Sequence, residues 1–404
     1  MSLQGEREAL LPPSAKMPRQ AEQDKVRNQA RFISGVALLL SVVFLWTLSN
    51  FITGALETGE GAWNKPFMIT YLNTASFVFY LIPSYFKYRR QRQNDYLPVQ
   101  TNEVPPPSPA TYTTRISLDN ANLVEAAPLP KLTVLETAKV AAWWSAVWFL
   151  GNWAVNAALA WTSVASTTIL TSTSGFFTLA LGRVFRVETL TRVKIFAAIA
   201  SFLGVVLVTQ SDSSLATASS GDSSYPDVPS NPILGDFAAI ISSIAYAVYV
   251  VLLKVQLGDE DRADPILLLG FAGLYNVICL IPVFPLLHWT GVETFELPPT
   301  STAWLICGIN GLITLSSDYI YILAVLKTSP MLVTVGLSLT IPCALVGSLF
   351  VPSAAVSAIT FTSLVGAVLV CLGFTMLGSE GWKKSQEPDG GVVRAEGRDV
   401  EAAQ

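Results

Sequence analysis

The feature that most constrains this chain is the placement of its basic residues relative to ten long apolar runs. If each run crosses a membrane once, 24 of the 25 Lys and Arg residues fall on one side, and only Lys65 falls on the other. Basic flanks are retained on the cytosolic side during insertion, so this asymmetry orients every helix. It predicts that both termini lie in the cytosol.

Each run has the roughly 17 to 25 residues that an α-helix needs to cross about 30 Å of hydrocarbon. We therefore predict an all-α membrane protein with ten transmembrane helices. The predicted spans are Phe32–Ile52, Pro66–Phe86, Val140–Trp161, Ser163–Leu181, Val193–Thr209, Ile233–Leu253, Pro265–Leu287, Ala303–Leu326, Pro330–Phe350 and Ala355–Leu377. A hydrophobic content of 51% with only 13% charged residues excludes an ordinary soluble protein.

Composition divides the chain into five segments. They are a disordered cytosolic tail (1–31), a first five-helix repeat (32–209), a non-cytosolic linker loop (210–232), a second five-helix repeat (233–377) and a disordered cytosolic tail (378–404). A proline-rich cytosolic insert at about 87–135 interrupts the first repeat. Its few large apolar residues cannot offset the entropy of ordering, so we expect it to be disordered.

The two halves resemble each other in the order of their helices. Residues 160–185 read AWTSVASTTILTSTSGFFTLALGRVF and residues 324–350 read AVLKTSPMLVTVGLSLTIPCALVGSLF, each followed by a hairpin and an apolar helix with glycine. With five spans per half, the second copy enters the bilayer upside down relative to the first. Inverted repeats of this kind are typical of secondary transporters, whose halves enclose a central site near the midplane.

Three blocks carry a family resemblance. They are residues 152–212, which begin NWAVNAALAW, KPFMITYLNT in span 2 and DFAAIISSIAYAVYVVLLK in span 6. Together they resemble the drug/metabolite transporter superfamily, and within it the EamA-type proteins of the F-type branch of solute carrier family 35. The resemblance covers nearly all of 32–377. It implies a ten-helix 5+5 bundle in which spans 1 to 4 and 6 to 9 line the pathway and spans 5 and 10 are peripheral.

The resemblance does not supply a substrate. Nucleotide-sugar carriers of the same superfamily have FYNN and GALNK motifs, and this sequence contains neither. A Golgi nucleotide-sugar antiporter is therefore the alternative to our main expectation, which is a secondary active transporter of a small polar organic metabolite.

Span 3 carries a polar stripe suited to a substrate pathway. Two indoles and two amides recur every four residues and so stack on one helix face, at Trp144, Trp148, Asn152 and Asn156. We predict that Trp148, Asn152 and Asn156 contact a planar polar solute. The alternative is that the two amides join neighbouring helices, a common use of amides in bilayers worth about 1 kcal/mol each.

Span 8 carries the counterpart of this stripe, at Asn310, Thr314 and Asp318. An aspartate at a helix centre costs about 2.5 to 3.5 kcal/mol on insertion scales, so Asp318 should face the bundle interior or a water-filled cavity. We predict that the three residues bind substrate and that Asp318 couples proton movement to transport. The alternative is a structural aspartate, hydrogen-bonded to hydroxyls or paired with Lys254 or Lys327.

Four further candidates come from single residues of other spans. Thr171 lies in span 4, whose hydroxyls and small side chains allow a neighbouring helix to approach closely. Tyr246 and Lys254 in span 6 are candidate substrate contacts. Their alternatives are core packing for Tyr246 and snorkelling to the membrane interface for Lys254. Pro342 in span 9 removes a backbone donor and is predicted to act as a hinge.

Spans 5 and 10 instead carry small residues at four-residue spacing, among them Ala200 and Gly204 in span 5 and Ser363 and Ala367 in span 10. This pattern predicts close helix packing. The contact can lie within the chain or between two protomers, so a homodimer is a candidate assembly.

The residue inventory argues against an enzyme. The chain has one histidine, His288, so it cannot assemble the histidine clusters of membrane metalloenzymes, and no nucleophile or nucleotide-binding motif appears. We predict no catalytic residue, no bound metal and no cofactor. A receptor or scaffold that transports nothing is the alternative of another class.

The N-terminal tail contains a candidate sorting signal. The segment EREALL resembles an acidic dileucine signal, with Glu6, Leu10 and Leu11 as its determinants. Such signals are bound by sorting adaptors, so we favour a vacuolar or lysosomal membrane over the Golgi. The expected partners are then a small-molecule substrate, the lipid bilayer and a sorting adaptor, with no nucleic acid.

Overall fold

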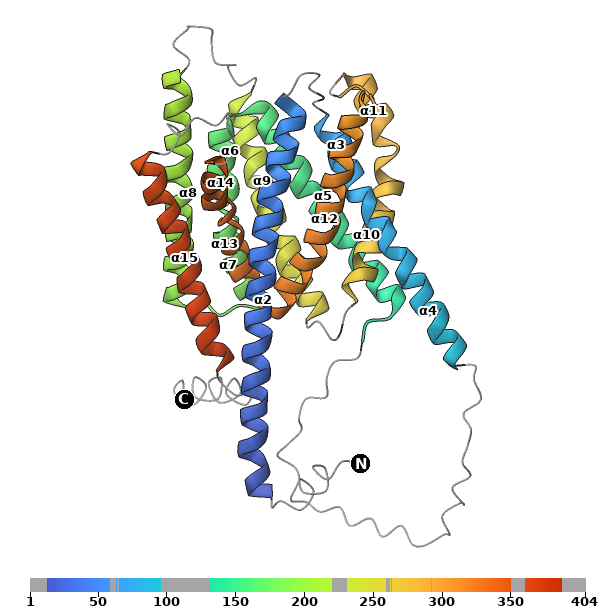
Figure 1. The fold of residues 1–404 in the computed structure, drawn as a ribbon, viewed down its shortest axis with the longest axis vertical. Helices are drawn as coiled ribbons and strands as arrows, with labels where there is room; N and C mark the ends of the chain where they lie inside the picture. The colour runs from blue at the N-terminus through green and yellow to red at the C-terminus, as the bar shows by residue number, and fades with distance from the viewer. Residues whose placement is uncertain are drawn as a thin grey trace.

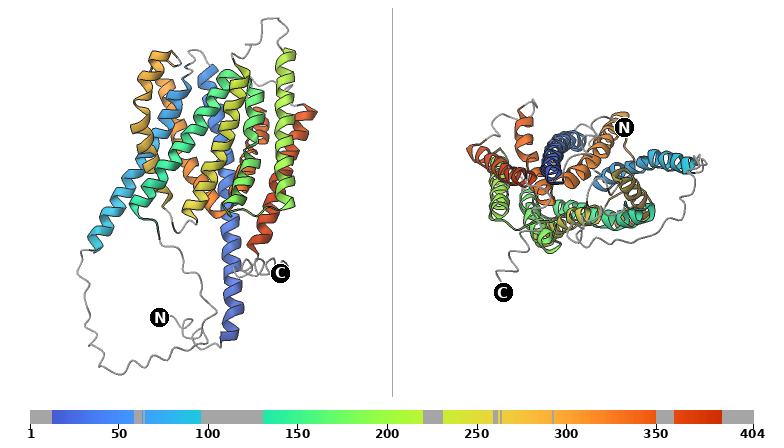
Figure 2. Two further views of the ribbon diagram at one scale, coloured as in Figure 1. Left: turned by 180° about the vertical axis from the view of Figure 1, so that it is seen from behind. Right: turned by 90° about the horizontal axis from the view of Figure 1, so that it is seen from below.

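The computed structural model of the chain describes residues 13–58, 63, 65–95, 131–219, 231–258, 262, 264–291, 293–349 and 360–386. Within these ranges the chain is helical and has no strand. The helices run side by side in one bundle (Figures 1 and 2). We call the end at which the first helix begins the lower end, and the opposite end the upper end; the last helix also finishes at the lower end (Figure 1).

The helices are, in chain order, α2 (Pro13–Thr58), α3 (Pro66–Ala75), η1 (Ser76–Tyr80), α4 (Leu81–Asp95), α5 (Val134–Trp161), α6 (Val164–Ser172), α7 (Ser174–Val184), α8 (Arg192–Ser219), α9 (Pro232–Leu257), α10 (Pro265–Leu280), α11 (Val283–Thr290), α12 (Ser301–Lys327), α13 (Pro330–Leu337), α14 (Thr340–Ser348) and α15 (Phe361–Ser385). Polar side chains cap many of them. Ser163, Ser329 and Thr360, for example, accept a backbone N–H from the first turn of α6, α13 and α15.

Seven segments of the described chain are long and apolar enough to cross a membrane, or eight if the bent pair α10 and α11 counts as one span. The chain is therefore an all-α membrane protein, and the count of ten stays a prediction. Neither α5 nor the α6–α7 pair is among the seven. In α5 the tryptophans and asparagines of the predicted polar stripe lower the hydropathy.

Several helices extend beyond the predicted spans. α2 begins at Pro13, so residues 13–31 form a helix that projects from the bundle instead of the predicted disordered tail (Figure 1). That segment is rich in Ala, Gln, Glu, Lys and Arg, which are strong helix formers and continue a helix that the span has already nucleated. α4 likewise continues to Asp95, within the predicted insert, and α15 to Ser385. α8 continues to Ser219, so residues 210–219 are helical and not part of the predicted linker loop, and α5 already begins at Val134. The sorting-signal candidates Glu6, Leu10 and Leu11 lie outside the described residues, as do residues 96–130.

Spans 4 and 9 are each broken in the middle. α6 ends at Ser172 and α7 begins at Ser174, while α13 ends at Leu337 and α14 begins at Thr340. Counted from the Thr-Ser pair that precedes each span, at 162–163 and at 328–329, the two breaks fall at the same distance along the chain. α6 and α14 lie towards the upper end, and α7 and α13 towards the lower end (Figure 1).

The two Thr-Ser junctions pack against glycines in the same manner. A Cβ on Gly235 of α9 would lie 2.6 Å from Thr162 Cβ, and a Cβ on Gly35 of α2 would lie 2.5 Å from Thr328 Cγ2. α9 packs along α5, and α2 packs along α12. Each half therefore has an interrupted helix, α6–α7 or α13–α14, and the start of that helix packs against a glycine of a long helix from the other half, α9 or α2.

The small residues of spans 5 and 10 are used within the chain. α8 packs along α15, and a Cβ on Gly204 would lie 2.5 Å from the carbonyl oxygen of Gly366. This close approach accounts for the small-residue pattern, because larger side chains would separate the two helices. The homodimer stays a prediction without support from this pattern.

The last turns of α7, α9 and α12 and the start of α8 lie at the lower end of the bundle (Figure 1), and they carry the basic residues Arg183, Lys254, Lys327 and Arg192. By contrast, Lys65 is at the upper end, where it donates to Thr294 at 2.5 Å and lies 3.3 Å from Glu296. The pKa of the Glu296 carboxyl lies below its ordinary value because Thr294 donates a hydrogen bond to it and Lys65 lies beside it. The one basic residue predicted on the upper side is thus held by a local acidic partner.

Candidate functional site

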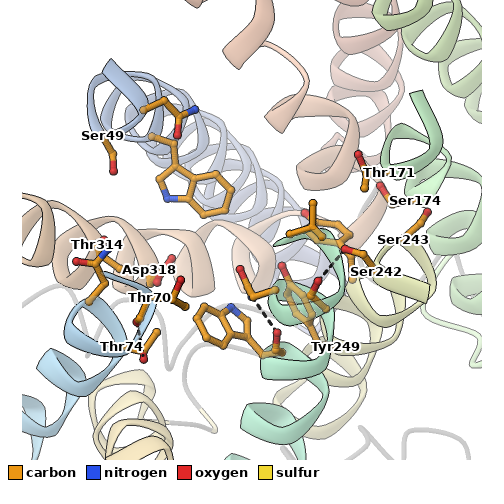
Figure 3. A pocket seen from close by; sticks show the side chains of 18 residues that line it. Ser49, Thr70, Thr74, Thr171, Ser174, Ser242, Ser243, Tyr249, Thr314 and Asp318 are labelled. Atoms are coloured by element: carbon orange, nitrogen blue, oxygen red, sulfur yellow. Dashed lines mark hydrogen bonds between the residues drawn. The ribbon is translucent and has the colours of Figure 1, made fainter. Parts of the chain in front are cut away.

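A polar cavity of about 380 Å³ lies near the middle of the bundle. It is lined by residues from α2, α3, α5, α6, α7, α9 and α12, so both halves of the chain contribute to it. Hydroxyl groups gather on two sides, with Thr70, Thr74, Thr314 and Asp318 on one side and Thr171, Ser174, Ser242 and Ser243 on the other (Figure 3). A volume of this size is in the range of small-molecule sites, roughly 300 to 1,000 Å³.

Six of the residues predicted to bind substrate line this cavity: Trp148, Asn152, Thr171, Tyr246, Thr314 and Asp318. Parts of the two polar stripes, Trp148 with Asn152 and Thr314 with Asp318, thus face the same space from opposite halves. Asn152 donates through Nδ2 to the carbonyl oxygen of Trp148 at 2.8 Å, one turn earlier on α5. This bond orients the amide within its own helix, and it does not join two helices.

Three predicted residues lie elsewhere. Asn156 is not among the residues that line the cavity. Asn310 is buried and accepts a hydrogen bond from Ser49, so it joins α12 to α2 as the alternative interpretation of bilayer amides expects. Lys254 donates through Nζ to the carbonyl oxygen of Leu326 at 2.6 Å, at the lower end of the bundle. The structure thus places these three residues outside the cavity lining, and their role as substrate contacts stays a prediction.

The family resemblance implies that spans 1 and 2 line the pathway, but sequence reasoning named no lining residue in either span. α2 supplies Trp46, Ser49 and Asn50, and α3 supplies Thr70, Asn73 and Thr74. A signal was present, because the polar end of KPFMITYLNT is unusual inside an apolar run. It was used only for the family resemblance. α9 adds Ser242, Ser243 and Tyr249 beside the predicted Tyr246.

Aromatic rings form one boundary of the cavity. Trp148 stacks on Trp144 with ring centroids 6.1 Å apart, and Trp144 meets the edge of Tyr249 at 6.0 Å. Tyr249 in turn contacts Tyr246 at 4.9 Å. Such packing fixes the ring orientations, and an indole or phenol face exposed to a cavity can stack on a planar solute.

The charged group of the cavity is a single carboxylate. Asp318 is 7% exposed, and no salt bridge or hydrogen bond of the described residues involves its carboxylate. The ion pair with Lys254 or Lys327, which the alternative interpretation of a structural aspartate expects, is therefore not formed among the described residues. None of the 18 residues that line the cavity is basic. Asp318 is thus placed to receive a cation or a proton.

Asn73 presents a second hydrogen-bond acceptor. Its Oδ1 atom is buried and has no hydrogen-bond partner among the described residues. Gly311 of α12 lies beside this oxygen, where a Cβ would be 3.9 Å from it. An unsatisfied buried acceptor costs free energy unless something donates to it.

A separate crevice of about 950 Å³ lies at the lower end, between α4, α10 and the lower part of α12. It shares no lining residue with the central cavity. Asp318 and Tyr319 follow each other on α12, and they face the cavity and the crevice respectively. The Tyr319 and Tyr80 rings, with centroids 6.2 Å apart, lie at this boundary.

The two halves are packed tightly together below the cavity. All eight residues of α13 are buried, and α13 contacts α7. Thr334 of α13 donates to Thr178 of α7 at 3.3 Å. α14, by contrast, has no buried residue and packs on α2 and α15, while α6 packs on α5, α8 and α9. The lower side is therefore closed between the broken helices, and the upper side is the more open one.

Pro342 explains where span 9 breaks. Proline has no N–H to donate four residues back, and its ring clashes with the carbonyl at that position. Four residues before Pro342 is Ser338, and the helix is interrupted there, with tighter bonds from Ser338 N to Val335 O and from Leu339 N to Gly336 O. The predicted hinge proline thus lies just after a real break. Its role in movement stays a prediction.

A membrane-embedded bundle whose two halves close around a polar cavity has the architecture of a multi-pass membrane transporter. Residues 141–290 match the family model described as solute carrier family 35, in its F type. The chain is 37% identical to an uncharacterized transporter of Schizosaccharomyces pombe, over 85% of this chain and 94% of the relative. The chain therefore belongs to solute carrier family 35, in the F-type branch. This family of carriers points away from an enzyme.

Two further likenesses agree with this assignment. An uncharacterized vacuolar membrane protein of Saccharomyces cerevisiae is 35% identical, over 88% of this chain and 92% of that protein. A solved crystal structure aligns with a TM-score of 0.55 at 12% identity, covering 87% of this chain and 98% of the solved one. At that identity the structural likeness supports the fold alone.

Proposed function

We propose that this chain is a secondary active transporter that moves a small polar organic metabolite across an endomembrane by alternating access. The observation that carries the proposal is the central polar cavity, which is shared by both halves and closed on one side by packing between them. Alternating access requires such a site between two units that can exchange which side is closed.

The ten-helix 5+5 arrangement is part of this proposal. The equivalent breaks in spans 4 and 9 support it, as do the glycines 35 and 235 that brace equivalent Thr-Ser junctions. In this arrangement α5 is span 3, the α6–α7 pair is span 4, and α10 with α11 is span 7. The start of α2 and the end of α15 then both face the cytosol, where the basic residues lie.

The lining of the cavity favours a neutral or cationic solute over an anionic one. Asp318 and the Asn73 carbonyl are acceptors, the aromatic rings can stack on a plane, and no lining residue is basic. A nucleotide sugar carries phosphate groups, which proteins usually bind with Arg, Lys or helix N-termini. The nucleotide-sugar antiporter is therefore the weaker candidate.

Asp318 is the residue that we assign to coupling. A buried carboxylate without a cationic partner can exchange a proton for a cationic or hydrogen-bonding substrate, because both compete for the same oxygen atoms. Binding of one then weakens binding of the other. This competition is the thermodynamic basis of exchange across a membrane.

We place the transporter in the vacuolar or lysosomal membrane. The relative named as a vacuolar membrane protein supports this location, and its similarity covers 88% of the present chain. The Golgi is the alternative. Fluorescent tagging of the full chain beside markers of both compartments tests the location, and removal of Leu10 and Leu11 tests the sorting signal.

Flux into liposomes tests the function itself. The purified full chain would be reconstituted and offered labelled vitamins, nucleosides, amino acids and nucleotide sugars, each with and without a pH gradient. We expect saturable uptake of a neutral or cationic planar solute, accelerated by the gradient. Binding of a compound without any flux would instead support a receptor or scaffold, and flux of nucleotide sugars alone would support the antiporter.

A further inference from the structure

The hairpin between α7 and α8 is built to hold one acidic side chain in a fixed place. At the end of α7, Val187 N bonds to Gly182 O at 2.9 Å and Arg186 N to Arg183 O at 3.2 Å. Arg186 adopts a left-handed backbone with φ of 58°. These are the bonds of a Schellman motif, which reverses the chain directly after a helix. Glu188 follows Val187 directly and packs on Gly182, where a Cβ would lie 2.7 Å from Glu188 Cγ.

Glu188 forms a buried ion pair with Lys194. The two residues are 5% and 8% exposed, and Glu188 Oε2 lies 2.7 Å from Lys194 Nζ. Lys194 also donates to the carbonyl and hydroxyl oxygens of Thr189, at 3.0 and 3.1 Å. A buried charge is tolerated only when it is paired and hydrogen-bonded, so Lys194 fixes the position of the Glu188 carboxylate.

The second oxygen of Glu188 reaches the other half of the chain. Glu188 Oε1 accepts a hydrogen bond from Met331 N at 3.0 Å. Met331 is in the first turn of α13, where backbone N–H groups have no partner within the helix and the helix dipole favours a negative charge. Pro330 precedes it and has no N–H. One carboxylate thus ties the first broken helix, through its hairpin, to the start of the second.

This contact lies on the closed side of the cavity. α7 and α13 are the halves of the broken helices that pack together at the lower end, next to the Thr334–Thr178 hydrogen bond. Any movement that opens the lower side must separate Glu188 from Met331. In the sequence, the corresponding connection after span 9, residues 349–360, contains no Asp or Glu, so it cannot supply an equivalent carboxylate.

We propose that Glu188 is a detachable latch: its carboxylate, positioned by Lys194, caps α13 across the two halves and favours the state that is closed on the lower side. This inference rests on the proposed alternating access and adds the residue that sets its balance. When Glu188 separates from α13, the Met331 N–H loses its hydrogen-bond acceptor, while the Glu188–Lys194 ion pair stays intact in the hairpin. The latch can therefore open without leaving a buried charge unpaired.

Thiol labelling measures the balance without requiring any transport. In the full chain with its four native cysteines replaced, Thr334→Cys reports on the lower side and Asn50→Cys reports on the cavity from the upper side. A membrane-impermeant maleimide is applied from each side to reconstituted protein. For Glu188→Gln we expect lower-side labelling at position 334 to rise and upper-side labelling at position 50 to fall, each about threefold to tenfold, as for a shift between two states.

Glu380→Gln is the matched control. Glu380 accepts from Thr191 at 2.9 Å and lies 4.0 Å from Lys194, so it belongs to the same cluster, but no described hydrogen bond joins it to α13. We expect this variant to leave both labelling rates unchanged. Glu188→Asp keeps the charge on a side chain that is one methylene shorter, and it should give an intermediate shift.

Three outcomes overturn the proposal. They are unchanged labelling in a folded Glu188→Gln protein, a rise at both reporters, which indicates a loosened fold, and failure of both Glu188 variants to fold, which assigns the pair a structural role. The labelling assay tests the latch, and the flux assay tests transport, so one proposal can fail without the other. Opposite shifts at the two reporters without flux of any compound would support the latch and count against transport. Flux with unchanged labelling would support transport and count against the latch.

Discussion

At the scale of single residues, Asp318 carries the greatest functional weight. It faces the cavity from α12, it is buried, and no cation of the described chain pairs with it. Its position in the middle of an apolar helix was visible in the sequence, because an acid there must face water, a partner or a ligand. The absence of a pairing lysine was not visible, since Lys254 instead bonds to the backbone of Leu326.

We predict that Asp318→Asn lowers proton-driven uptake at least about tenfold, equivalent to ~1.4 kcal/mol, and removes its dependence on a pH gradient. The reason is that an amide can still accept a hydrogen bond but cannot exchange a proton. Uptake into liposomes at several imposed gradients measures the effect. Asp264→Asn is the control, because Asp264 pairs with Lys87 at 2.6 Å at the lower end and asparagine can replace it as a helix cap. Equal uptake by the wild-type chain and Asp318→Asn would refute the coupling role.

Asn73 shows what could not be predicted from the sequence. Asparagine inside a span is most often hydrogen-bonded to a neighbouring helix, and Asn310 follows that rule through Ser49. Asn73 departs from it, with a buried Oδ1 that has no partner among the described residues. Which of two similar asparagines faces the cavity depends on how α3 and α12 are rotated, and rotation is set by packing across the whole bundle.

At the scale of helices, α8 and α15 are held together by backbone contact at small residues. Their four-residue spacing was enough to predict close packing. The partner was left open, because the same pattern serves contacts within a chain and between chains. The structure pairs Gly204 with Gly366 inside the chain, and a side chain at either position meets a carbonyl oxygen.

Gly204→Ala should therefore destabilise the folded chain by about 1 to 3 kcal/mol, because the new methyl group meets backbone that cannot rotate away. Thermal unfolding in detergent measures the change. Gly378→Ala in α15 is the matched control, since no atom lies within 4 Å of a Cβ there, and it should be neutral or slightly stabilising. Similar melting temperatures for the two variants would contradict the proposed role of the contact.

The break in span 9 gives a second prediction at this scale. Pro342→Ala restores an N–H that can donate to Ser338 O, so α13 and α14 should join into one straighter helix. We expect uptake to slow severalfold while thermal stability is kept or raised, because the change restores a regular helix at the interruption and leaves every cavity residue in place. Pro265→Ala is the control, since that proline occupies the first turn of α10, where it costs little. Unaltered uptake in Pro342→Ala would remove Pro342 from the mechanism.

At the scale of the whole molecule, the apolar runs predicted the all-α membrane class that the structure shows, while the count of ten spans and the orientation from the basic residues stay predictions. The breaks within spans 4 and 9 were only partly foreseen. Pro342 signals one of them, but nothing comparable marks Thr173, which is held by its bond to Ser243 at 2.9 Å on α9. That contact exists only once both halves are assembled. Properties that arise from assembly, such as the Glu188 contact to α13, lie beyond what spacing in one segment can predict.

The last prediction concerns the orientation of the whole chain. If ten spans are present and the basic lower end faces the cytosol, epitope tags at the two termini should both be accessible from the cytosol in intact organelles. A tag placed in the linker between α8 and α9 should be protected. Ten crossings return the chain to its starting side, whereas seven would not, so the assay separates the two counts directly. Basic flanks stay in the cytosol during insertion, so this rule predicts which end of the bundle faces the cytosol. Lys65 is the one basic residue predicted on the upper side, and Glu296 lies beside it. Termini on opposite sides would mean that the number of spans is odd. The 5+5 repeat would then be wrong, and so would the pairing of α6–α7 with α13–α14 on which alternating access depends.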